Sequence, residues 1–126
     1  MIGGRVLDAS AVVAFASGRS VYAAALVWTA AEEGLVLVIP STAVAVAWSQ
    51  LAEKHHPVLE VLLRLPVTVV DDLTATRACA VGGTGADLLD AHALLCAKER
   101  GWPLVTGDTT RYRRIASGVV EVEQLP

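Results

Sequence analysis

Residues 85–98 read Gly-Ala-Asp-Leu-Leu-Asp-Ala-His-Ala-Leu-Leu-Cys-Ala-Lys, and this stretch predicts a long helix that is buried on most sides. Asp87 and Asp90 fall in its first turns, where the partial positive charge of a helix N-terminus favours acids. Their i, i+3 spacing lets both carboxylates lie on one face of the helix. The residues behind them are almost all apolar, which is typical of a helix packed against a core. Because an unpaired buried charge is very costly, we expect the acids at this end to have partners elsewhere in the chain.

Short apolar runs alternate with helical segments along the rest of the chain. The expected strands cover residues 5–8, 35–39, 67–70, 103–106 and 119–122. The expected helices cover residues 9–16, 21–33, 42–55, 58–65, 73–81, 85–100 and 109–116. This alternation predicts an α/β sandwich with a mostly parallel sheet and right-handed crossovers.

Length and composition restrict the class of protein. The 126 residues, 54% of them apolar and 18% charged, predict one globular domain that spans residues 1–126. No run approaches the roughly 18 apolar residues that a membrane helix needs. Asp8 interrupts the first apolar run, which argues against a signal peptide. We therefore expect a cytoplasmic protein that uses no membrane, in which Cys79 and Cys96 are reduced.

The charge distribution is uneven. A net charge of −3 argues against a protein that coats nucleic acid along its whole surface. However, half of the ten basic residues fall in a short C-terminal stretch, namely Lys98, Arg100, Arg111, Arg113 and Arg114. This cluster is interpreted either as a solvated rim or as a contact surface for phosphates. The glycine-rich segment 82–85 is interpreted as a flexible turn, because no strand directly precedes it and no Lys follows it.

Three acids are expected to meet at one edge of the sheet. Asp8 follows the first strand, Asp108 follows the fourth, and Asp90, or less favourably Asp87, begins the long helix. Sites in parallel sheets form at the carboxyl ends of the strands. Crowded carboxylates repel one another, and bound Mg²⁺ or Mn²⁺, which prefer oxygen ligands, would resolve the repulsion. Such ions activate water and hold the leaving oxygen of a phosphodiester.

These segments resemble a PIN-domain protein of the VapC toxin type over essentially the whole chain. The matching motifs are Val6-Leu-Asp-Ala-Ser10, Asp90-Ala-His-Ala93 and Leu104-Val-Thr-Gly-Asp108. The resemblance implies a three-layer sandwich around a five-stranded parallel sheet, and endoribonuclease activity that depends on Mg²⁺ or Mn²⁺. It also implies an RNA substrate, a small antitoxin protein that restrains the toxin, and a homodimer.

The resemblance also assigns roles to individual residues. Carried over by position, Asp8, Asp90 and Asp108 are the metal-site and catalytic acids. Ser10 and Thr106 are hydroxyls that support these acids, and Asp87 is a possible outer acid. Arg111, Arg113 and Arg114 would border the site and contact RNA phosphates, because a guanidinium matches phosphate geometry.

One position departs from the family pattern. The family has a fourth acid, a Glu, on the helix after the second strand, and here that place falls at Val46 or at Ala47. The next acid, Glu53, lies about 10 Å further along the helix axis than Val46, which is too far for a simple replacement. Three consequences compete. The remaining acids bind one metal weakly and activity is reduced; the site is dead and the protein is an inactive module that binds an antitoxin or RNA; or Val46 was introduced to make a toxic chain tolerable.

Other residues give weaker signals. His92 lies two residues after Asp90, so on a helix it faces away from that acid, and we interpret it as a structural histidine rather than a general base. A phosphohydrolase with an Asp nucleophile at the first strand end is a rival enzyme class. Such an enzyme usually has a second acid two residues later, where this chain has Ser10. A receiver domain is less favoured, because its phosphoacceptor Asp and sheet-edge Lys are not matched.

Overall fold

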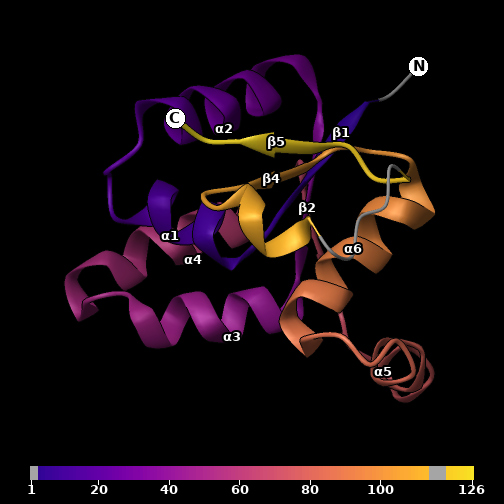
Figure 1. Cartoon of the computed structure of the whole chain (residues 1–126). Helices are drawn as coiled ribbons and strands as arrows, with labels where there is room; N and C mark the ends of the chain where they lie inside the picture. Colours follow the sequence, from indigo (N-terminus) through magenta and orange to yellow (C-terminus); the bar gives the residue numbers. More distant parts are fainter. Residues whose placement is uncertain (1–2, 114–118) are drawn as a thin grey trace.

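The computed structural model describes residues 3–113 and 119–126, and its centre is a parallel β-sheet (Figure 1). The strands are β1 (Gly4–Leu7), β2 (Val36–Pro40), β3 (Thr68–Asp71), β4 (Leu104–Thr106) and β5 (Val122–Gln124). Their order across the sheet is β3-β2-β1-β4-β5, and every neighbouring pair is parallel. The carboxyl ends of the strands therefore lie along one edge, where the expected site should form.

Six α-helices and two short 3₁₀ helices connect the strands in the described part of the chain. They are α1 (Ala9–Ala16), α2 (Val21–Glu33), α3 (Ser41–Gln50), η1 (Glu53–His55), α4 (His56–Arg64), α5 (Ala75–Gly82), α6 (Leu88–Arg100) and η2 (Thr109–Tyr112). In Figure 1, α2 lies above the strands, α1, α3 and α4 lie to the left and below, and α5 and α6 lie to the right and lower right. The helices α1 to α4 pack on one face of the sheet and α6 on the other. The fold is the expected three-layer α/β sandwich.

Each face of the sheet has its own core. Alternate residues of a strand point to opposite faces, so Leu7 of β1 packs with α1 to α4 while Val6 packs with α6. In β4, Val105 likewise packs on the α1 to α4 face, and Leu104 packs on the α6 face. Gly4 is required at the start of β1, because a Cβ there would come within 2.6 Å of the ring of Trp102. The sheet is covered on both faces, which explains why its strands read as continuous apolar runs.

Several expected boundaries were wrong. The helix expected over residues 42–55 ends at Gln50, and Pro57 lies in the first turn of α4 instead of interrupting a helix. Proline is tolerated there because its missing N–H would have no intrahelical acceptor. The last strand begins at Val122, so it overlaps the expected range 119–122 by one residue. The helix expected over 109–116 is a 3₁₀ turn as far as Tyr112, and residues 114–116 lie outside the described residues.

Helix α2 is apolar on its outer as well as its inner face. Val21, Tyr22 and Trp28 are 83%, 64% and 69% exposed, while Val27 and Ala30 on the opposite side are buried. No single helix of the described chain is long and apolar enough to cross a bilayer; α1 and α2 reach that composition only together, across a 94° bend. The outer face of α2 is thus an apolar surface without a partner in the described structure.

Candidate functional site

Asp8 stands at the carboxyl end of β1 and begins α1. Its Oδ1 accepts hydrogen bonds from the Ala11 backbone N–H (2.9 Å) and from the Ser10 hydroxyl (2.6 Å). Its Oδ2 accepts a hydrogen bond of 2.6 Å from the Tyr112 hydroxyl. The residue is only 3% exposed, so these three donors stabilise its buried charge. Asp8 is the N-cap of α1, as its extended backbone and its hydrogen bond from the Ala11 N–H show.

Asp90 lies in the first turn of α6, at the same edge of the sheet. Asp87 caps this helix by accepting from the Leu89 and Asp90 N–H groups at 3.0 and 3.2 Å. Arg111, on η2, places both Nε and an Nη 3.0 Å from Asp90 Oδ1, so the buried acid has a cationic partner. The same guanidinium lies 4.0 Å from Asp87.

The electrostatics show that Asp8 and Asp90 share one site. Burial raises the pKa of Asp90 and outweighs the opposing effect of Arg111, and the negative charges of Asp87 and Asp8 raise it further. Burial, followed by the charge and hydrogen bond of Asp8 and the charge of Asp90, raises the pKa of the Tyr112 hydroxyl. Tyr112 is therefore a neutral donor to Asp8.

Asp108 reaches the same edge but does not join the other two carboxylates. It is exposed, and Thr110 donates to its Oδ1 from the backbone (3.0 Å) and from the hydroxyl, which lowers the pKa of Asp108. The acidic ligand atoms of Asp8, Asp90 and Asp108 do not all lie within 4.8 Å of one another in the described structure. The sequence placed the third acid at the correct strand end, but its side chain caps η2 instead.

The two expected hydroxyls connect the acids. Ser10 Oγ lies 3.1 Å from Thr106 Oγ1, and the Asp108 backbone N–H donates to Thr106 Oγ1 at 3.1 Å. The Gly107 N–H donates to Ser10 Oγ at 2.7 Å. Thus a continuous set of hydrogen bonds runs from Asp8 to the turn that carries Asp108. Ser10 and Thr106 therefore lie between Asp8 and the turn that carries Asp108.

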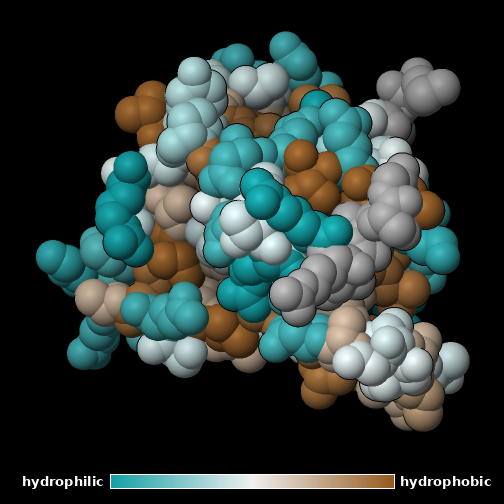
Figure 2. Space-filling model, in the orientation of Figure 1, coloured by the Kyte–Doolittle hydropathy of each residue, from teal (hydrophilic) through white to brown (hydrophobic). Residues whose placement is uncertain are grey.

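The three arginines expected to contact RNA have different surroundings. Arg111 pairs with Asp90, as described above, while Arg113 is exposed and makes no ion pair with a described residue. Arg114 lies outside the described residues. Figure 2 shows hydrophilic side chains gathered over the segment between β4 and β5, which includes the exposed Asp108, Arg111 and Arg113.

Val46 lies on α3, at one of the two positions where the resemblance places the family's fourth acid. It is half-buried and packs against the core on the α1 to α4 face of the sheet. No carboxylate is therefore supplied from this position. The oxygen donors of Asp8 and Asp90 have the chemistry that Mg²⁺ or Mn²⁺ requires. Arg111 and Tyr112 contact those same oxygens, so a cation would compete with the chain's own donors.

A second polar cluster lies behind the long helix, and the sequence predicted only part of it. Asp71, at the end of β3, accepts from His92 Nε2 (2.8 Å) and Arg77 Nε (2.9 Å) through its Oδ1. His92 is fully buried, and its Nδ1 lies 2.7 Å from the Thr42 hydroxyl. The helix expected over residues 73–81 begins at Ala75, and the sequence predicted no role for Asp71. The sequence signal that could have identified Asp71 is an acid directly after an apolar strand, which is the same pattern that identified Asp8.

Asp71, His92 and Cys96 are the one group of three described His, Cys, Asp or Glu residues whose ligand atoms lie within 4.8 Å of one another. Two observations argue against a metal there. The Arg77 guanidinium already pairs with Asp71 and reaches 4.0 Å from the Cys96 sulfur. Burial raises the pKa of the Cys96 thiol to about 12, so it stays protonated rather than becoming the thiolate that binds metals. The cluster is a structural network that joins β3, α3, α5 and α6.

The fold and the buried acid pair together define a nuclease-type α/β protein. The family model of the PIN domain matches residues 5–118, and the chain belongs to this family. Proteins of this family typically bind a divalent metal. Comparison with curated proteins gives no match to a particular protein.

The Asp71 network predicts a pH-dependent contribution to stability. Although burial alone raises the pKa of Asp71, the His92 hydrogen bond and the Arg77 charge bring it below its usual 3.8. A carboxyl group whose pKa is lower in the folded protein stabilises the fold at pH values above its unfolded-state pKa. This stabilisation is lost as the pH falls through the folded-state pKa. We expect Asp71→Asn to reduce the free energy of unfolding by about 2–4 kcal/mol at neutral pH, measured by urea denaturation. The difference from the wild type should shrink as the pH falls below 3.8.

The control for this experiment is Asp72→Asn, because the Asp72 side chain makes no hydrogen bond or ion pair with a described residue. It should leave the acid dependence of stability unchanged. Equal losses in the two variants, or a constant difference between Asp71→Asn and wild type from neutral to acid pH, would contradict the assignment.

The Arg111 contact predicts how the site responds to metal. Arg111→Ala removes the cation that neutralises Asp90, so the affinity for Mn²⁺ near neutral pH should rise by about tenfold. Isothermal titration calorimetry measures this directly. Arg113→Ala is the matched control, because it removes the same charge from a neighbouring exposed position. If the two variants bind Mn²⁺ alike, Arg111 does not compete for the acid pair.

Proposed function

We propose that the protein is a metal-dependent endoribonuclease of the VapC toxin type whose activity is reduced because Val46 replaces an acid. The observation that carries this proposal is the pair Asp8 and Asp90. Both are buried, they come from a strand end and a helix start at one edge of the sheet, and each lies in the other's electrostatic field. A buried acid with a raised pKa beside a second buried acid, as for Asp90 beside Asp8, is typical of functional sites.

Each residue has a proposed role. Asp8 and Asp90 would hold Mg²⁺ or Mn²⁺, and Asp108 would contribute from the exposed rim. The bound ion would supply an activated water and stabilise developing charge on a phosphodiester. Ser10 and Thr106 fix the Asp8 carboxylate and the turn before Asp108 through the hydrogen bonds described above.

A second candidate function is a non-catalytic PIN module that binds RNA or an antitoxin. Specific contacts favour it. Arg111 lies 3.0 Å from Asp90 and Tyr112 lies 2.6 Å from Asp8, so both buried acids already have partners from η2. In addition, Val46 packs into the core where the family has its fourth acid. The two functions differ in whether a divalent ion binds at all.

Restoring the missing acid tests the first proposal. Val46→Glu should raise Mn²⁺ affinity by about tenfold or more, because it adds one negative charge at the position where the family carries its fourth acid. Cleavage of a structured RNA should rise in parallel, as measured by gel electrophoresis of the products. Adding Asp90→Asn to this variant should abolish both effects.

Ala45→Glu is the control, because it adds the same charge to an exposed position on the same helix. Val46→Gln offers a neutral oxygen donor of similar shape if the charged variant is too unstable to purify. Absence of specific Mn²⁺ heat in the wild type, Val46→Glu and Val46→Gln would support the non-catalytic module instead.

The proposed toxin type implies protein partners, namely an antitoxin and a second copy of the chain. The exposed apolar face of α2, which contains Val21, Tyr22 and Trp28, supports a homodimer interface. Large exposed apolar patches mark interaction surfaces, because burying them is favourable. The antitoxin would then bind elsewhere, near the hydrophilic edge that carries the acids.

Trp28→Ser should convert the dimer to a monomer, which static light scattering would show as a halving of the mass. Trp48→Ser is the control, since Trp48 is 41% exposed on another helix and stacks on His56 with ring centroids 3.8 Å apart. An unchanged mass in Trp28→Ser, or dissociation in Trp48→Ser alone, would place the interface elsewhere.

A further inference from the structure

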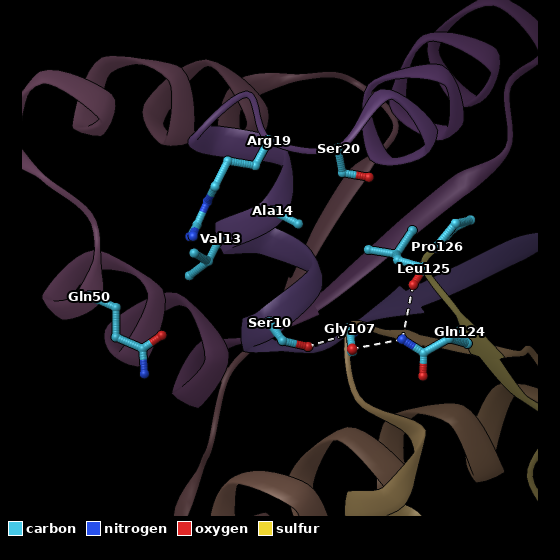
Figure 3. A pocket seen from close by; sticks show the side chains of 10 residues that line it. All are labelled: Ser10, Val13, Ala14, Arg19, Ser20, Gln50, Gly107, Gln124, Leu125 and Pro126. Atoms are coloured by element: carbon cyan, nitrogen blue, oxygen red, sulfur yellow. Dashed lines mark hydrogen bonds between the residues drawn. The ribbon is translucent and has the colours of Figure 1, made fainter.

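A pocket of about 600 Å³ opens next to Ser10 and Gly107 (Figure 3). It is bounded by α1, by the loop between α1 and α2, by the end of α3, by the turn after β4 and by the last residues of the chain. Its size falls in the range of small-molecule sites in proteins.

The pocket is physically continuous with the candidate site. Ser10 lines it and also donates to Asp8 Oδ1 at 2.6 Å. Gly107, which lines the pocket beside Ser10, belongs to the turn that carries Asp108. A molecule in the pocket would therefore contact Ser10, whose hydroxyl is bonded to Asp8, and the turn that carries Asp108.

Arg19 is the one charged side chain among the described residues that line the pocket. Its Nε donates to the Ser17 hydroxyl at 3.0 Å, which orients the side chain. No described carboxylate lies within 4.0 Å of it, whereas the guanidinium of Arg111 is held by Asp90. Figure 3 shows the Arg19 side chain extending between α1 and Gln50. Arg19 is thus a better anion ligand than Arg111.

The amides of the pocket differ in their remaining hydrogen-bonding capacity. Gln124 donates to the carbonyls of Gly107 (2.7 Å) and Leu125 (2.9 Å) and accepts from the Thr109 N–H (2.9 Å), so it is a structural link. The Gln50 side chain is exposed and makes no hydrogen bond to a described residue. Gln50 therefore offers both a donor and an acceptor to a ligand.

We propose that this pocket binds one nucleotide of a single-stranded RNA segment, next to Ser10 and Gly107. Arg19 pairs with a backbone phosphate and Gln50 hydrogen-bonds a base edge. A guanidinium without an acidic partner fits a phosphate, and an amide fits the mixed donors and acceptors of a base. The apolar surfaces of Val13 and Leu125 provide walls for the flat base. This inference deepens the proposed function, because it specifies how that site takes its substrate.

The test measures RNA binding in EDTA, where a metal-dependent nuclease does not cut. The probe is an unstructured RNA of mixed sequence, about ten nucleotides long. Fluorescence anisotropy gives its Kd at several salt concentrations for the wild type, Arg19→Ala, Gln50→Ala and Arg64→Ala. Arg64→Ala is the matched control, because it removes an exposed charge on α4 that does not line the pocket.

Arg19→Ala should weaken binding about tenfold and reduce the slope of log affinity against log salt by about one. Gln50→Ala should weaken binding with an unchanged slope, and Arg64→Ala should bind as the wild type does. Equal losses in Arg19→Ala and Arg64→Ala would overturn the proposal. So would binding of an acidic peptide at Arg19 with no effect of Arg19→Ala on RNA.

Because no metal is present, the result is independent of catalysis. A protein that binds RNA through Arg19 but never cuts it refutes the proposed nuclease function and leaves the nucleotide pocket standing. A protein whose Val46→Glu variant cuts RNA, while Arg19→Ala binds RNA normally, supports the nuclease function and refutes the pocket.

Discussion

The burial of two carboxylates at the edge of a parallel sheet is the constraint on which this structure depends. Asp8 and Asp90 are 3% and 6% exposed, and each would destabilise the fold strongly if left without a partner. The chain supplies a hydroxyl and an N–H from α1, a tyrosine hydroxyl and a guanidinium from η2. The position of η2 is therefore coupled to the charge of the site.

The donors that contact Asp8 and Asp90 explain why two different functions are proposed for this site. Hard oxygen ligands at the carboxyl edge suit a divalent ion, and the PIN family places its metal chemistry on this kind of fold. In this chain, Arg111 and Tyr112 already satisfy the oxygens, and Val46 adds no charge to attract an ion. Under the proposed function, competition between the Arg111 guanidinium and a bound divalent ion would determine whether the site is catalytic.

A second buried network keeps the long helix in register with the sheet. Asp71 and His92 join the end of β3 to α6, and Arg77 extends the connection from α5 to Glu99. Every buried polar side-chain atom among the described residues has a partner, as expected when polar groups are removed from water. This network holds α6 firmly, and Asp90 lies on that helix.

The sequence by itself determined the alternation of strands and helices, and it placed Asp8, Asp90 and Asp108 at one edge. Hydrophobic periodicity and the rule that parallel strands share a carboxyl edge are local or topological, so they can be read from residue order. Only the tertiary structure decided that Asp108 caps η2, that Tyr112 and Arg111 hold the buried acids, and that Asp71 pairs with His92. The contacts of Arg111, Tyr112 and Asp71 join residues 21 to 104 positions apart in the chain, and they depend on the direction in which short connecting segments fold back. Residue spacing does not encode that direction, because it follows from the packing of the whole domain.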